Sequence, residues 1–118
     1  MEIYCEEITL KPWGSYALIL EKPNYKVKRI VIKPNQRLSK QVHRKRDEYW
    51  IVVEGEGIIT RDEDKVYCSK GYNIDIPRGM IHRAENLSDD KDFIFVEIQI
   101  GECKEEDIVR LEDSYGRN

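Results

Sequence analysis

The chain has 118 residues and a formal net charge of −3, with 40% hydrophobic and 36% charged residues. This length predicts one domain over residues 1–118, and the composition is typical of a folded protein rather than a disordered one. The weakly acidic balance excludes an obvious nucleic-acid partner, and no stretch approaches the roughly 20 apolar residues of a membrane span. Three widely spaced cysteines, Cys5, Cys68 and Cys103, predict reduced thiols in a cytoplasmic protein rather than a disulfide framework.

Short strands separated by turn residues are expected along most of the chain. In chain order they are Ser15–Leu20, Tyr25–Ile32, Arg37–His43, Glu48–Val53, a hairpin of Gly57–Arg61 and Lys65–Cys68, Tyr72–Ile76, Met80–Glu85 and Phe93–Ile100. The acidic tail over residues 104–113 is predicted as a short helix with Ile108 and Leu111 on one side. Many short strands with Gly and Pro turns predict an all-β sandwich or barrel.

Four residues on these predicted strands form a candidate metal site. Gln41 and His43 are two apart, so both side chains point to the same face of a strand. Glu48 begins the next strand, and His82, the second of only two histidines, lies on a third. Two imidazole nitrogens, one carboxylate oxygen and one amide oxygen suit one divalent transition metal ion, such as Mn, Zn, Co, Ni or Fe.

The spacing of these residues resembles the two conserved motifs of the cupin family. The places of the first motif are taken by Asn35, Gln41, His43, Glu48 and Gly55. Those of the second are taken by Gly71, Pro77, Gly79, His82 and Asn86. The first motif departs from the family twice, because Asn35 stands in place of Gly and Gln41 in place of the first His. The resemblance implies a double-stranded β-helix, the jelly-roll barrel of cupins, with short N- and C-terminal extensions.

A narrower resemblance covers nearly the whole chain and points to the type II mannose-6-phosphate isomerase domain. It is carried by Lys11–Tyr16, Tyr25–Ile30, Gln36–Val53, Ile76–Asn86 and Asp107–Arg117. Gln at position 41 is usual in that family, whereas family histidines are replaced here by Arg44, Lys45 and Tyr49. In most such enzymes the domain follows a mannose-1-phosphate guanylyltransferase domain. Only ten residues precede Lys11, so a free-standing isomerase domain is expected.

The resemblance implies a metal-dependent aldose–ketose isomerase that interconverts mannose 6-phosphate and fructose 6-phosphate. Arg46 and Glu97 are the predicted catalytic residues, because Arg46 flanks the ligands and Glu97 is a candidate proton-transfer base. Whether the strand face of Glu97 points inward or toward solvent is open. Arg37, Lys28 and Arg117 are the predicted substrate-binding cations, with a sugar phosphate as the small-molecule partner.

Two other functions remain open from the sequence, and a homodimer is expected. One alternative is a non-catalytic sugar- or sugar-phosphate-binding cupin, and the other is a metal-dependent oxygenase. The strand Glu48–Val53 is apolar on both faces. If Glu48 points inward, then Tyr49, Ile51 and Val53 point outward and need a covering surface, for which a second subunit is predicted.

Overall fold

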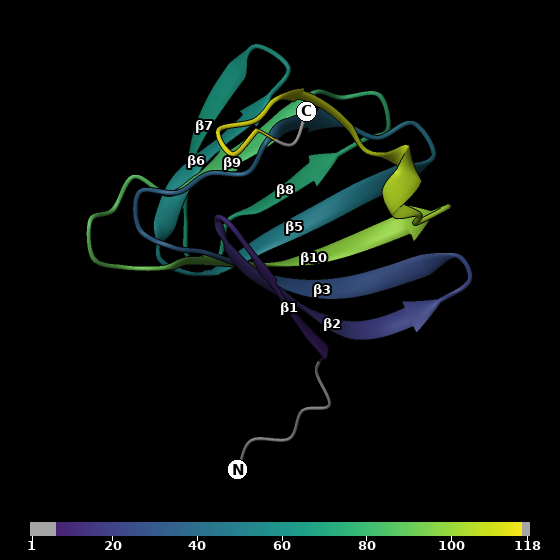
Figure 1. The fold of residues 1–118 in the computed structure, drawn as a ribbon, viewed down its shortest axis with the longest axis horizontal. Helices are drawn as coiled ribbons and strands as arrows, with labels where there is room; N and C mark the ends of the chain where they lie inside the picture. Colours follow the sequence, from purple (N-terminus) through teal and green to yellow (C-terminus); the bar gives the residue numbers. More distant parts are fainter. Residues whose placement is uncertain (1–6, 117–118) are drawn as a thin grey trace.

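The computed structural model describes residues 7–116, which form two antiparallel β-sheets that face each other (Figure 1). The first sheet contains, in spatial order, β1 (Glu7–Lys11), β2 (Gly14–Lys22), β3 (Tyr25–Ile32), β10 (Phe93–Gly101), β5 (Arg46–Glu54) and β8 (Asn73–Ile76). The second contains β11 (Val109–Glu112), β4 (Lys40–Val42), β9 (His82–Glu85), β6 (Glu56–Arg61) and β7 (Asp64–Ser69). The predicted all-β double-stranded β-helix is confirmed.

Strand alternation on β5 divides its side chains between the interior and the surface. Glu48, Trp50 and Val52 are all buried, whereas Tyr49 and Ile51 are exposed. Successive side chains of a strand point to opposite faces, so one short segment supplies both the interior and the outer face of its sheet. The interior is packed with aromatic rings, and Trp50 stacks on Phe95 with ring centroids 4.4 Å apart.

Two asparagines of the cupin motifs have structural roles. Asn35, which stands where the motif has glycine, adopts a left-handed backbone with φ of 61°, a conformation that asparagine tolerates better than most residues. Asn86 is buried, and its side-chain amide donates hydrogen bonds to the carbonyls of Ile32 and Lys91. Its oxygen accepts from the backbone N–H of Ser88. Asn86 therefore ties the loop after β9 to the end of β3.

The tail does not form the predicted helix. It contains a single 3-10 turn, η1 (Glu105–Asp107), followed by β11, which pairs with β4. The Asp107 carboxylate accepts hydrogen bonds from the backbone N–H groups of Arg44 and Lys45, which fixes the tail beside the edge of β4. Once the tail pairs as a strand, Ile108 lines the interior cavity while Leu111 is exposed. The expectation that they share one side was wrong for this reason.

Some strand boundaries also differ from those expected. β3 has the predicted bounds, whereas the predicted strand Arg37–His43 is reduced to β4 and an isolated bridge between Arg37 and Glu85. β1 was not predicted. Within residues 7–116, no helix is long and apolar enough to cross a membrane. Cys68 and Cys103 are buried free thiols, and Cys5 lies outside the described residues.

Candidate metal centre

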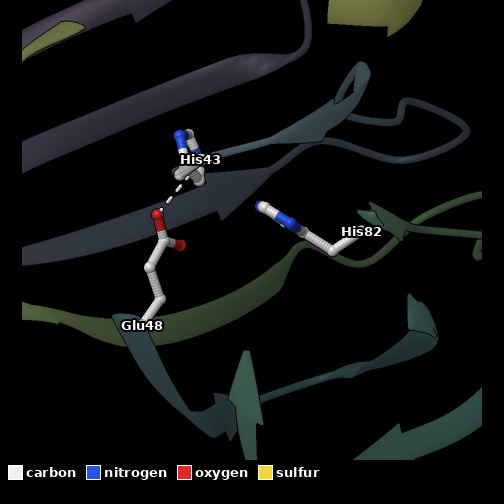
Figure 2. Close-up of side chains that lie close together, drawn as sticks. All are labelled: His43, Glu48 and His82. Carbon is white, nitrogen blue, oxygen red and sulfur yellow. Dashed lines mark ion pairs between the residues drawn. The ribbon is translucent and has the colours of Figure 1, made fainter. Parts of the chain in front are cut away.

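Three side chains that are distant in sequence meet between the sheets. His43 directly follows β4, Glu48 is on β5 and His82 begins β9 (Figure 2). Each is at most 3% exposed, and one ligand atom from each lies within 4.8 Å of the others. The closest pair is His43 Nε2 and Glu48 Oε2, which are 3.1 Å apart. These three residues therefore form a compact His–Glu–His cluster of the kind that binds a divalent metal.

Gln41 lies beside this cluster, as its position on β4 predicts. It is directly opposite His82 in the β4–β9 register and lines the same cavity. Its amide nitrogen donates to Ser39 Oγ at 3.1 Å. The amide oxygen is the atom that Gln41 offers to a metal, so the structure brings all four predicted ligands to one cavity.

The protonation states of the cluster suit metal binding. Burial lowers the pKa of His43 to about 4 and also lowers the pKa of His82, so both imidazoles are neutral at pH 7. His82 Nδ1 is 3.0 Å from the carbonyl of Met80, and donation there leaves Nε2 with the lone pair that a metal needs. Burial opposes ionisation of Glu48, but His82, His43 and Arg46 outweigh it and lower its pKa to about 2.

The Arg46 guanidinium already contacts two atoms of the cluster. Its Nε donates to Glu48 Oε2 at 2.9 Å, and its Nη2 lies 3.2 Å from His43 Nε2. Trp50 Nε1 donates to the other carboxylate oxygen, Glu48 Oε1, at 3.0 Å. The donor set fits a divalent ion in chemistry and spacing, and binding through His43 Nε2 requires Arg46 to withdraw from that nitrogen.

The cluster lies in a cavity of about 80 Å³ that opens to solvent. The cavity is lined by four cationic side chains and two carboxyl groups: Lys11, Lys28, Arg46, Arg110, Glu48 and Glu97. Aromatic and apolar residues, among them Tyr16 and Trp13, form another part of the wall. A polar pocket with an apolar wall and several convergent charges is the usual form of a small-molecule site.

Glu97 points into this cavity, which settles the orientation that the sequence left open. It is 6% exposed on β10, and Gln99 Nε2 donates a hydrogen bond to its Oε1. Burial, with a further contribution from the charge of Glu48, raises the pKa of Glu97 to about 8. A buried carboxyl group that titrates near neutral pH is suited to proton transfer.

The other predicted substrate-binding cations fall in different places. Lys28 is buried, lines the cavity and holds its ammonium 4.3 Å from the centroid of the Tyr16 ring. Arg37 does not line the cavity: its side chain is 41% exposed, and its Nε donates to Ser114 Oγ at 2.7 Å. Arg37 was predicted to bind the substrate, but the C-terminal tail holds its side chain outside the cavity. Arg117 lies outside the described residues.

The family histidines that this chain lacks do not fall in the cavity. Arg44 and Lys45 are exposed in the loop between β4 and β5, and Tyr49 is exposed on the outer face of β5. None of the three lines the cavity, so their replacement leaves the His–Glu–His cluster and Glu97 intact.

Several cavity residues were not identified from the sequence. Trp50 was not identified as a partner of Glu48, although its spacing of two residues from Glu48 on one strand was the available signal. Arg110 was missed because the tail was expected to be helical. Lys11 and Tyr16 had no local signal, since β1 and β2 reach the cavity only through sheet pairing.

Comparison with known proteins identifies the family. Residues 2–113 match the family model described as "Mannose-6-phosphate isomerase C-terminal". The chain belongs to this family. Two curated relatives are each similar to this chain over 108 residues, or 91% of its length. They are the xanthan biosynthesis protein XanB of Xanthomonas campestris pv. campestris, 41% identical, and a mannose-1-phosphate guanylyltransferase of Escherichia coli K12, 39% identical.

The chain spans about a quarter of the length of these relatives, 23% of XanB and 22% of the guanylyltransferase. Among solved structures, the capsular polysaccharide assembling protein CapF of Staphylococcus aureus matches with a TM-score of 0.81 and 25% identity. That match covers 93% of this chain and 35% of CapF. The cupin fold of this chain is therefore shared with part of CapF.

Proposed function

We propose that this protein is a metal-dependent aldose–ketose isomerase that interconverts mannose 6-phosphate and fructose 6-phosphate. One observation carries the proposal: the buried carboxyl group of Glu97 shares a single cavity with the cluster of His43, Glu48 and His82. Membership of the mannose-6-phosphate isomerase C-terminal family supports the choice of substrate. The buried free thiols of Cys68 and Cys103 support a cytoplasmic location for the reaction.

Isomerisation of an aldose to a ketose moves a proton between C1 and C2 through an enediolate. A divalent ion held by Gln41, His43, Glu48 and His82 would polarise the sugar oxygens as a Lewis acid. Glu97 in its ionised form takes the proton from one carbon and returns it to the next. Because Glu97 is only 6% exposed, the proton that it carries exchanges little with water.

Arg46 has a separate task in this scheme. Its guanidinium is 3% exposed and brings a positive charge into the cavity. Its Nη1 is buried without a hydrogen-bond partner among the described residues. This atom can donate to the oxyanion of the enediolate, where a charge-assisted hydrogen bond stabilises the developing negative charge.

The test is an isomerase assay on metal-depleted protein reloaded separately with Mn, Co, Ni, Zn or Fe, together with metal analysis of the purified protein. We expect conversion of mannose 6-phosphate with at least one of these metals. His82→Ala should lose both bound metal and conversion. Tyr49→Phe is the matched control, because Tyr49 lies on the outer face and its change should leave both intact. Absence of conversion with every metal would refute the proposal.

A second candidate, a sugar-phosphate-binding cupin without catalysis, is favoured by the position of Arg46. Its contacts with Glu48 and His43 give the cluster an internal cation, so the site is electrostatically satisfied without a metal. This candidate predicts thermal stabilisation by mannose 6-phosphate that is the same before and after metal depletion, with no turnover. The isomerase predicts stabilisation that depends on the metal.

A further inference from the structure

Most residues that line the cavity are buried, but Lys11 and Tyr16 in the first sheet and Ile108 and Arg110 near the second are partly exposed, so the cavity opens on this side. β1 and β2 lie at one edge of the first sheet, and β11 is an edge strand of the second. Figure 1 shows β1 in front of the other strands of its sheet and the C-terminal segment running along the second sheet. Both edges contribute to the cavity wall: Lys11 and Tyr16 come from one, and Ile108 and Arg110 come from the other segment. A ligand that enters here meets residues from both edges.

Arg110 stands beside the candidate metal ligands. In the β4–β11 register it lies directly opposite Gln41. Its Nε is buried and has no hydrogen-bond partner in the part of the chain that the structure describes. The neighbouring arginine Arg83 differs, because it pairs with Glu112 at 2.9 Å and donates to the carbonyl of Leu38. A buried guanidinium nitrogen without a partner is costly unless a ligand supplies the acceptor.

The opposite edge provides further positive charge. The ammonium groups of Lys11 and Lys28 lie 5.8 and 4.3 Å from the centroid of the same Tyr16 ring, so both charges contact one aromatic side chain of the cavity wall. With Arg46 and Arg110, four cations line a cavity that contains two carboxyl groups. This excess of positive charge matches a dianion rather than a neutral sugar.

We propose that Arg110 and Lys11, on the two edges of the opening, bind the phosphate group of the substrate. The planar guanidinium of Arg110 can donate two parallel hydrogen bonds to phosphate oxygens, and the Lys11 ammonium supplies a second charge. The phosphate is then held at the mouth, and the carbonyl end of the sugar reaches inward to Glu97. The identity of the sugar rests on the proposed isomerase function, whereas phosphate binding does not require turnover.

The test compares Arg110→Gln with Arg37→Gln as the matched control. Arg37 also contacts the C-terminal tail, but its guanidinium lies outside the cavity. Titration calorimetry on metal-depleted protein measures binding of mannose 6-phosphate, mannose and inorganic phosphate. We expect Arg110→Gln to weaken binding of both phosphate ligands about ten- to a hundredfold and to leave mannose unchanged. Arg37→Gln should bind all three as the wild type does.

Two further variants keep the result interpretable if Arg110→Gln unfolds. Lys11→Gln removes the opposing charge at the other edge and should weaken the phosphate ligands about tenfold. Arg110→Lys keeps the positive charge but cannot donate two parallel hydrogen bonds. Its affinity for the phosphate ligands should therefore fall between those of wild type and Arg110→Gln. Circular dichroism and thermal unfolding establish which variants are folded.

The outcomes separate this inference from the proposed function. Phosphate-dependent binding that is lost in Arg110→Gln, without turnover in any metal, leaves the anion site standing and removes the isomerase. Turnover by wild type with an unchanged KM in Arg110→Gln leaves the isomerase standing and overturns the anion site. Equal losses in Arg110→Gln and Arg37→Gln also overturn it, because only Arg110 lines the cavity.

Discussion

Replacing Glu97 by glutamine should make the protein more stable at neutral and alkaline pH. The burial of Glu97 raises its pKa from 4.5 to about 8. Below pH 4.5 the carboxyl group is protonated in both the folded and the unfolded chain, so it adds no pH dependence. Between pH 4.5 and 8 the unfolded chain releases the proton while the folded chain retains it, and the free energy of unfolding falls. Above pH 8 both states are ionised and the loss stays constant.

The size of the effect follows from the two pKa values. Each pH unit over which only the unfolded chain is ionised costs about 1.4 kcal/mol. Ionisation of Glu97 should therefore lower the free energy of unfolding of the wild type, relative to Glu97→Gln, by about 3 kcal/mol at pH 7 and about 5 kcal/mol at pH 8. The amide introduced by Glu97→Gln keeps an acceptor oxygen for Gln99 Nε2 and carries no ionisable proton. The substitution therefore removes this loss without removing the hydrogen bond.

Urea unfolding of metal-depleted protein, followed by tryptophan fluorescence from pH 4.5 to 8.5, measures the effect. The curves of wild type and Glu97→Gln should converge near pH 4.5 and separate by several kcal/mol at pH 8. Glu63→Gln, an exposed acid in the turn after β6, should follow the wild type. Parallel curves for wild type and Glu97→Gln would refute the assignment of a raised pKa to Glu97. Under the proposed function, the stabilised variant should also be inactive.

Three other predictions concern the cluster, the second motif and the outer face. The pKa of Glu48, lowered to about 2, means that Glu48 contributes about 3 kcal/mol of stability that is lost as pH falls from 4.5 to 2, so wild type should decline more steeply than Glu48→Gln in acid titrations. Asn86→Ala should lower the free energy of unfolding by about 3 kcal/mol, since it leaves buried backbone groups unpaired; a loss below about 1 kcal/mol would contradict this. Tyr49 and Ile51 are 44% and 47% exposed on the outer face of β5, where we predict a dimer contact. Light scattering should therefore find a dimer for the wild type and a monomer for Ile51→Glu. A monomeric wild type would exclude this interface.

The ligand cluster could be predicted from the sequence because most of its residues lie close together in the chain. Gln41 and His43 share a strand face by alternation, and Glu48 follows a single short loop. The orientation of Glu97 could not be settled from the sequence, because β10 carries apolar residues on both faces. The alternation of its side chains therefore does not show which face points inward. Its pairing with β3 and β5 decides the orientation, and that pairing is a long-range contact.

The tail was mispredicted for a related physical reason. Helix propensity in its acidic sequence is a weak preference, whereas pairing with the exposed edge of β4 satisfies backbone groups of both strands. The same pairing places Arg110 in the cavity and Leu111 outside it. One long-range contact therefore changed both a secondary-structure assignment and the set of candidate substrate-binding residues.

The arrangement of β5 explains how this chain can differ from its family without losing the cluster. Arg46, Glu48 and Trp50 occupy consecutive inward positions, and both Arg46 and Trp50 donate hydrogen bonds to the Glu48 carboxylate. Tyr49 lies between two of them in sequence but on the opposite face of the sheet. A substitution at Tyr49 therefore alters the outer surface, where a dimer contact is predicted, and leaves the donor atoms inside unchanged. Substitutions at the even-numbered inward positions of β5 should therefore change metal binding and catalysis, whereas those at the odd-numbered outward positions should change dimer formation.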